Sequence, residues 1–191
     1  MAHLALFALL ACAHTPQEAA AAPAQVDEVS GQPFTLQVRS DTLQAGQPMP
    51  LETVFDGFGC TGGNVSPQLS WSAGPEGTAS YAVMMYDPDA PTGVGFHHWW
   101  VANLSPETLS LAEGAAGSGL PEGAVEGRND YSTSTYGGPC PPEGRTHRYQ
   151  FTVWALDSEL PVDENTSAAV VRFLVRNKTL AAGRLEATYA R

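Results

Sequence analysis

An apolar run that ends abruptly in an acidic, proline-rich loop constrains this chain more than any other feature. Residues 80–86 are nearly all apolar or aromatic, which predicts a strand buried on both faces of a sheet. The run ends at Asp87-Pro88-Asp89-Ala90-Pro91, where proline fixes φ and removes backbone donors, so the strand stops. Residues 98–104 predict the next strand. The chain therefore turns back on itself here and carries titratable side chains at the turn.

Strand patterns dominate the remainder of the chain. Apolar and polar side chains alternate over residues 34–38 and 149–156, as in strands that place one face on a core. Residues 105–128, rich in glycine and alanine, are expected to form a long surface excursion. Further short strands are expected over residues 51–55, 68–71 and 185–189. These patterns predict a mainly β, largely antiparallel fold.

One helix is expected, over residues 167–182. Its apolar positions lie near helical spacing, and a polar residue before them can cap the first turn. The apolar positions are Val170, Val171, Leu174, Val175 and Leu180, and the cap is Asn165, Thr166 or Ser167. The chain of 191 residues has no repeat and no dividing linker, so we expect a single domain with this helix near its C-terminal end.

Charge and histidine placement narrow the classes of partner. The formal net charge is −11 at pH 7, which argues against a nucleic-acid partner and against attraction to an anionic membrane surface. Adjacent His97 and His98 point to opposite faces of a strand, so they cannot both bind one ion. No Cys/His cluster has metal-ligand spacing. We therefore expect neither a metal nor a cofactor.

The N-terminal residues resemble the signal peptide of a bacterial lipoprotein. An apolar run from Leu4 ends in Leu9-Leu10-Ala11-Cys12, which is similar to a lipobox. The resemblance implies a signal peptide over residues 1–11, lipidation of Cys12, a flexible tether over residues 12–30 and a domain over residues 31–191. The protein is then exported, periplasmic or membrane-anchored, and meets the membrane only through Cys12. The alternative is an ordinary signal peptide cleaved within residues 19–24.

Two cysteines remain if Cys12 carries lipid. Cys60 and Cys140 form an even pair, and an oxidising compartment favours a disulfide between them. Two free, buried thiols are the alternative. The sequence leaves both open, because it does not give the distance between the two Cα atoms.

Several sequence blocks in a fixed order resemble the phosphatidylethanolamine-binding protein family, which includes the Raf-kinase-inhibitor proteins, and in particular its bacterial branch. The resemblance extends over residues 34–191. The blocks are Cys60-Thr61-Gly62-Gly63-Asn64-Val65-Ser66-Pro67 with Trp71, Asp87-Pro88-Asp89-Ala90-Pro91, Phe96-His97-His98-Trp99, Gly127-Arg128-Asn129-Asp130, residues 136–144 and His147-Arg148-Tyr149.

This resemblance implies a large central antiparallel sheet packed on a smaller sheet, with a C-terminal helix. It also implies a pocket for small anions such as phosphate, acetate or a phospholipid head group. The residues that the resemblance assigns to the pocket are Asp87, Phe96, His98, Tyr136, Gly138, Pro141, Pro142, His147 and Tyr149.

The residues themselves support a pocket at the same place. Asp87 and His98 are eleven positions apart, so a loop that returns the chain can bring them together, where the carboxylate favours a charged imidazole. With backbone N–H groups of Gly137 and Gly138, such an imidazolium makes an oxyanion site. His147 can complete it from another segment. The alternative is an Asp–His pair that only braces the loop.

Three functions are compatible with these features. The preferred one is an exported, non-enzymatic protein that binds a small anionic or phosphorylated ligand. The second is an inhibitor or modulator of a partner protein, a protease or a kinase. The third is a hydrolase that uses Asp87 and His98, which lacks a recognisable nucleophile because no Gly-x-Ser-x-Gly motif is present. We therefore expect no enzyme activity.

Overall fold

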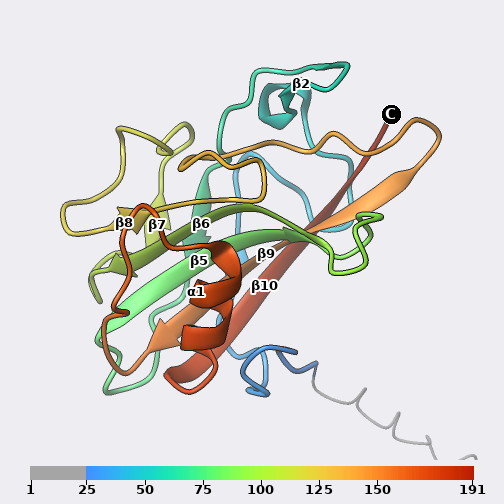
Figure 1. The fold of residues 1–191 in the computed structure, drawn as a ribbon. Helices are drawn as coiled ribbons and strands as arrows, with labels where there is room; N and C mark the ends of the chain where they lie inside the picture. The colour runs from blue at the N-terminus through green and yellow to red at the C-terminus, as the bar shows by residue number, and fades with distance from the viewer. Residues whose placement is uncertain (1–24) are drawn as a thin grey trace, which may run out of the picture.

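The computed structural model describes residues 25–191, so the predicted signal peptide, Cys12 and most of the predicted tether lie outside the described residues. Within residues 25–191, no helix is both long and apolar enough to span a bilayer. The described chain folds around one large antiparallel sheet, whose long strands run diagonally across Figure 1.

Five strands form the large sheet in the order β10-β9-β5-β6-β8, and all neighbouring pairs are antiparallel. Their bounds are β5 (Ser80–Asp87), β6 (Phe96–Leu104), β8 (Val125–Glu126), β9 (Thr146–Leu156) and β10 (Thr179–Ala190). A three-stranded sheet contains β1 (Val38–Arg39), β4 (Leu69–Trp71) and β7 (Ser110–Leu111), and a two-stranded one contains β2 (Asp56–Gly57) and β3 (Cys60–Thr61).

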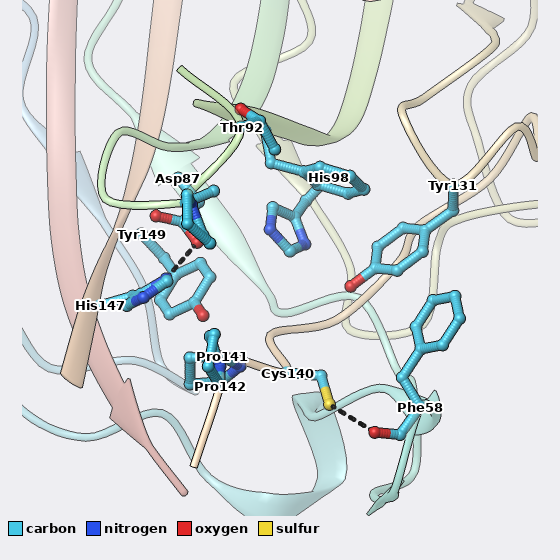
Figure 2. A pocket seen from close by; sticks show the side chains of 13 residues that line it. Phe58, Asp87, Thr92, His98, Tyr131, Cys140, Pro141, Pro142, His147 and Tyr149 are labelled. Carbon is cyan, nitrogen blue, oxygen red and sulfur yellow. Dashed lines mark hydrogen bonds and ion pairs between the residues drawn. The ribbon is translucent and has the colours of Figure 1, made fainter. Parts of the chain in front are cut away.

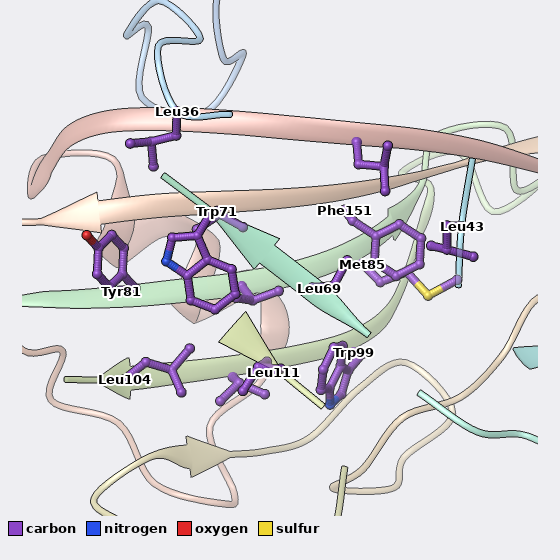
Figure 3. Close-up of a cluster of buried hydrophobic side chains, with 14 of the residues drawn as sticks. Leu36, Leu43, Leu69, Trp71, Tyr81, Met85, Trp99, Leu104, Leu111 and Phe151 are labelled. Carbon is purple, nitrogen blue, oxygen red and sulfur yellow. The ribbon is translucent and has the colours of Figure 1, made fainter. Parts of the chain in front are cut away.

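The large sheet is covered on both faces. Tyr81, Val83 and Met85 alternate along β5 into a core shared with the three-stranded sheet (Figure 3). Ala82 and Met84 enter a second core beneath helix α1 (Ala168–Val175). Burial on both faces explains why the sequence of β5 is nearly continuous in apolar residues. The prediction of a large antiparallel sheet packed on a smaller one is confirmed.

The predicted helix is wrong in its second half. Helix α1 ends at Val175, and β10 begins at Thr179 after a three-residue turn. Leu180 continues the apolar spacing of the helix, but it belongs to a strand that pairs with β9 along almost its whole length. Because that pairing satisfies a row of backbone groups, it overrides the helix propensity of this alanine-rich segment. The helix lies near the C-terminal end and precedes the last strand, as predicted.

Three other local predictions also need correction. Residues 51–55 are not a strand, because Leu51–Thr53 form a 3-10 helix. In residues 34–38, only Val38 belongs to a strand, while Phe34 makes an isolated bridge to Ala182. The excursion over residues 105–128 contributes β7 and β8 to the two larger sheets. Single backbone bridges and two-residue strands leave no periodic pattern in a sequence.

The packed domain begins before residue 31, inside the segment predicted as a tether. Asp27 is fully buried and accepts a hydrogen bond of 2.8 Å from Trp154 Nε1. Its carboxylate also accepts from the backbone and hydroxyl of Ser30 and lies 3.5 Å from Arg184 Nη2. An acidic residue in a polar segment gives no sign of such burial, because its partners come from β9 and β10 far along the chain.

We expect Asp27→Ala to lower the free energy of unfolding by about 2–3 kcal/mol, because it leaves the buried Trp154 N–H without an acceptor. Glu28→Gln is the matched control: Glu28 pairs with the same Arg184, but its side chain is 61% exposed. Glu28→Gln should lower the free energy of unfolding by less than about 1 kcal/mol. Equal losses in a urea denaturation series would contradict a buried anchor at Asp27.

Candidate functional site

An irregularity in β6 aims the side chains of the candidate site. Met85 pairs with Trp99, whereas the next residue, Tyr86, pairs with His97, so His98 is an extra residue in the ladder. Such a β-bulge places two consecutive side chains on the same face of the sheet. It brings Trp99 into the core face while His98 remains at the pocket. His97 lies on the other face, where its ring packs against Tyr86 at 4.9 Å between centroids.

The ends of three adjacent strands supply the polar side chains of the site. Asp87 ends β5, its direct partner Phe96 begins β6, and His147 and Tyr149 lie near the start of neighbouring β9. Because the strands are antiparallel, the end of β5 and the starts of β6 and β9 lie side by side at the same end of the sheet. The Pro-rich segment after Tyr136 closes the other side (Figure 2).

These residues surround a cavity of about 220 Å³. Most of the predicted pocket residues line it, namely Asp87, Phe96, His98, Pro141, Pro142, His147 and Tyr149. The residues that the prediction missed are Phe58, Ala90, Pro91, Thr92, Tyr131 and Cys140. Ala90, Pro91 and Cys140 lie inside the family sequence blocks, and Thr92 and Tyr131 each directly follow one. Position in or beside a block was therefore the available signal for these five residues. Phe58 had none.

Asp87 pairs with His147 and not, as expected, with His98. His147 Nδ1 lies 2.7 Å from Asp87 Oδ2, and both side chains are buried. The other Asp87 oxygen accepts from the backbone N–H of Asp89 at 2.8 Å. The loop does return the chain, but β9 lies beside β5 and presents its own histidine to the carboxylate. Only the Nε2 of His147 is left for a ligand.

His98 is held as a neutral imidazole, which corrects the predicted imidazolium. Its Nδ1 lies 2.8 Å from the carbonyl oxygen of Gly137 and 3.1 Å from that of Gly138. Because carbonyls only accept, Nδ1 carries the proton and Nε2 holds a lone pair. Burial lowers the pKa of His98 from 6.5 to about 4, although the Gly137 carbonyl and the Asp87 charge oppose this shift.

The backbone N–H groups of Gly137 and Gly138 are not free for an anion, contrary to expectation. Gly137 N donates to the carbonyl of His98 at 3.0 Å, and Gly138 N donates to Asn64 Oδ1 at 2.8 Å. A side chain at Gly138 would strike the backbone of Thr53, so this glycine permits close packing of two loops. Tyr136 also lies outside the cavity lining, and its hydroxyl donates to the Thr53 carbonyl at 2.9 Å.

Tyr149 brings an unsatisfied hydroxyl to the pocket wall. The residue is fully buried, and its hydroxyl has no hydrogen-bond partner among the described residues. Burial and the nearby Asp87 charge raise the pKa of Tyr149, so the hydroxyl keeps its proton. A buried hydroxyl without a partner costs about 1–3 kcal/mol, which marks this atom for explanation.

Aromatic rings form the remaining wall. Tyr131 stacks on Phe55 at 4.3 Å between centroids and meets Phe96 edge-on at 4.8 Å. Its hydroxyl donates to the Gly138 carbonyl at 3.0 Å, which fixes the ring against the loop. Phe58 lies at the outer end of this stack and is 78% exposed. The pocket therefore combines a polar base with an apolar mouth.

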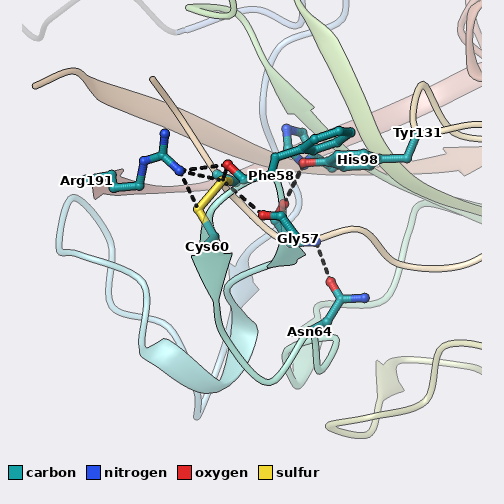
Figure 4. The surroundings of a disulfide bond; sticks show 9 residues. Gly57, Phe58, Cys60, Asn64, His98, Tyr131 and Arg191 are labelled. Carbon is teal, nitrogen blue, oxygen red and sulfur yellow. Dashed lines mark hydrogen bonds between the residues drawn. A yellow bond between two sulfur atoms is a disulfide. The ribbon is translucent and has the colours of Figure 1, made fainter. Parts of the chain in front are cut away.

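The predicted disulfide is confirmed. Cys60 and Cys140 are bonded, with 6.0 Å between their Cα atoms and a sequence separation of 80 (Figure 4). The bond ties the Pro-rich segment to the β2–β3 hairpin, and Cys140 itself lines the cavity. Arg191 Nη1 donates to the Phe58 carbonyl at 2.8 Å beside the two sulfur atoms. Within residues 25–191, no group of three or more His, Cys, Asp or Glu side chains is placed to hold a metal ion.

The fold and this pocket define a class of protein. The family model described as phosphatidylethanolamine-binding protein matches residues 39–190. This chain belongs to that family, and the resemblance of its sequence blocks is confirmed.

Two similar proteins come from bacteria. UPF0098 protein YbcL of Escherichia coli K12 is 46% identical over 165 residues, covering 84% of this chain and 90% of that protein. Putative lipoprotein LppC of Mycobacterium tuberculosis H37Rv is 32% identical over 155 residues, covering 81% and 72% respectively. The crystal structure of E. coli YbcL, described as a new member of the mammalian PEBP family, matches with a TM-score of 0.80 and 45% identity. That match covers 82% of this chain and 98% of YbcL.

The neutral state of His98 predicts a pH dependence of stability. Unfolded His98 takes up a proton below about pH 6.5, whereas the folded ring stays neutral until about pH 4. The unfolded state then binds more protons, so the free energy of unfolding falls as the pH drops from 6.5 to 4.

Between pH 6.5 and pH 4, the free energy of unfolding of wild type should fall by on the order of 3 kcal/mol more than that of His98→Gln, in which position 98 does not titrate. Denaturant titrations at several pH values measure both curves. Parallel curves would show that His98 is not held neutral by the fold.

Proposed function

We propose that the protein is a non-enzymatic binding protein whose pocket receives a small anion or a phosphoryl group. The unpartnered hydroxyl of Tyr149 carries this proposal, because a fold that leaves a buried donor unsatisfied gains when a ligand oxygen arrives. Among the described residues, neither His98 Nε2 nor His147 Nε2 has a hydrogen-bond partner, and both rings line the same pocket. A tetrahedral oxyanion has enough oxygen atoms to contact the Tyr149 hydroxyl and both imidazole Nε2 atoms at the same time.

The composition of the lining supports binding over catalysis. A hydrolase that uses covalent chemistry needs a nucleophile next to a base. The cysteine in this pocket, Cys140, is oxidised to a disulfide, and the Thr92 hydroxyl donates to the Gly95 carbonyl. The described lining therefore places no serine and no free cysteine beside the Asp87–His147 pair, and the raised pKa of Tyr149 keeps its hydroxyl protonated.

Recognition of a partner protein is the second candidate, and Phe58 is the observation that favours it. A large aromatic side chain that is 78% exposed at the mouth of a polar pocket gives the folded chain little stability. An inhibitor or modulator role would use this ring beside a partner's acidic or phosphorylated side chain. Phe58→Ala would then weaken a protein partner while leaving free phosphate bound as before.

Export belongs to the same proposal. The disulfide supports an oxidising compartment, and a relative is named a putative lipoprotein. We infer attachment through a lipid at Cys12 as the only membrane contact.

Tyr149→Phe should separate binding from stability. We expect it to weaken phosphate binding at least about tenfold, because the ligand loses a charge-assisted hydrogen bond. The same substitution should leave the free energy of unfolding unchanged or raise it, since it removes an unsatisfied buried hydroxyl. Isothermal titration calorimetry and urea denaturation measure the two effects.

Tyr136→Phe is the matched control, because its hydroxyl already has the Thr53 carbonyl as partner and lies outside the pocket. It should cost about 1 kcal/mol of stability and leave phosphate affinity unchanged. The proposal fails if wild type binds neither phosphate nor acetate, or if Tyr149→Phe binds phosphate as tightly as wild type.

A further inference from the structure

We propose that the pocket selects oxyanions that carry a proton, namely hydrogen phosphate and singly protonated phosphomonoesters, over fully deprotonated or diesterified ones. This inference rests on the proposed function and names the ligand class of the same site. It depends on which atoms of the pocket accept hydrogen bonds and which donate them.

His98 presents an acceptor to the ligand. Its Nδ1–H is used by the carbonyls of Gly137 and Gly138, so the lone pair of Nε2 is the only polar group that His98 offers. In Figure 2 the imidazole of His98 faces Tyr149 and His147 across the pocket. An oxygen without a hydrogen would meet this lone pair with its own, which is repulsive. A P–OH group instead donates to it.

The negative charge of Asp87 also favours a protonated ligand. Asp87 is 3% exposed and lines the cavity with a carboxylate, and the lining contains no lysine or arginine. Its two oxygens are engaged by His147 and by the Asp89 backbone N–H. A ligand therefore meets no fixed cation that would compensate two full negative charges in a buried site. Dihydrogen phosphate and a singly protonated monoester carry a charge of −1 and lower that cost, and the P–OH group of any protonated form supplies the missing donor.

The remaining groups hold the other oxygens. The Tyr149 hydroxyl donates to one ligand oxygen, because no described residue accepts from it. His147 Nε2 is the third polar atom, and its partner Asp87 fixes the orientation of the ring at 2.7 Å. The pocket thus offers the ligand one hydrogen-bond acceptor, His98 Nε2, and one hydrogen-bond donor, the Tyr149 hydroxyl. Hydrogen phosphate matches both, whereas sulfate matches only the donor.

The test compares three ligands with the full folded protein at pH 7 and constant ionic strength. Inorganic phosphate carries a P–OH group in both of its forms at this pH. Sulfate matches its size and a charge of −2 but has no proton, and dimethyl phosphate has a charge of −1 but no P–OH. Dimethyl phosphate also stands for the diester of a lipid head group. Isothermal titration calorimetry gives the three dissociation constants.

We expect phosphate to bind at least about tenfold more tightly than either comparison ligand, because a site built around a ligand hydroxyl rejects analogues that lack it. If sulfate or dimethyl phosphate binds as tightly as phosphate, the proton requirement is wrong while oxyanion binding stands. If none of the three binds, the proposed function fails together with this inference.

Two variants locate the preference on His98. His98→Gln can donate its amide N–H₂ to the glycine carbonyls and present its oxygen to the pocket, so it should keep the preference for phosphate over sulfate. His98→Leu has no acceptor and should bind the two ions with similar constants. His97→Gln is the control on the other face of the strand and should match wild type. If a folded His98→Leu protein keeps the full preference for phosphate over sulfate, the assignment to Nε2 is wrong. If that variant does not fold, the comparison of the three ligands with wild type remains the test.

Discussion

The hydrogen bonds from His98 Nδ1 to the carbonyls of Gly137 and Gly138 hold the site together. They join the bulge in β6 to the Pro-rich segment, and the Gly137 N–H returns a bond to the His98 carbonyl. Because the ring sits in a nearly dry environment, these bonds also decide which nitrogen keeps its proton. These bonds therefore set both the geometry at the base of the pocket and the tautomer of His98, while burial keeps the ring neutral. The disulfide at Cys140 and the ring of Tyr131 then hold the same segment from its other side.

The large sheet supplies the rigidity that such a site requires. Both of its faces are buried, and the ladder between β5 and its two neighbours runs to the edge of the pocket. Side chains at strand ends are therefore positioned by packing behind them and not by mobile loops. This rigidity has a cost at Tyr149, because its backbone is fixed in the strand ladder and its hydroxyl has no hydrogen-bond partner among the described residues. A buried polar group without a partner needs an explanation, and for Tyr149 the explanation that we propose is a ligand oxygen.

Much of the fold could be predicted from sequence, since periodicity along residues 80–86 and 149–156 reflects local burial. Two-residue strands and the end of helix α1 could not, because pairing partners distant in the chain decide them. The family blocks identified most residues of the pocket. They did not reveal that Asp87 would pair with His147, or that the glycine amides would be occupied. Those outcomes follow from strand order and a one-residue bulge, and neither leaves a local signature.

The buried carboxylate of Asp27 also fixes the start of the described chain on the large sheet. It is bonded to Trp154, whose side chain lies in the core beneath α1, whereas Tyr149 points to the face that carries the pocket. Asp27 is therefore held on the face of the large sheet that α1 covers. A single buried charge thus fastens the start of the described chain to β9 and β10, the last two long strands of the sheet.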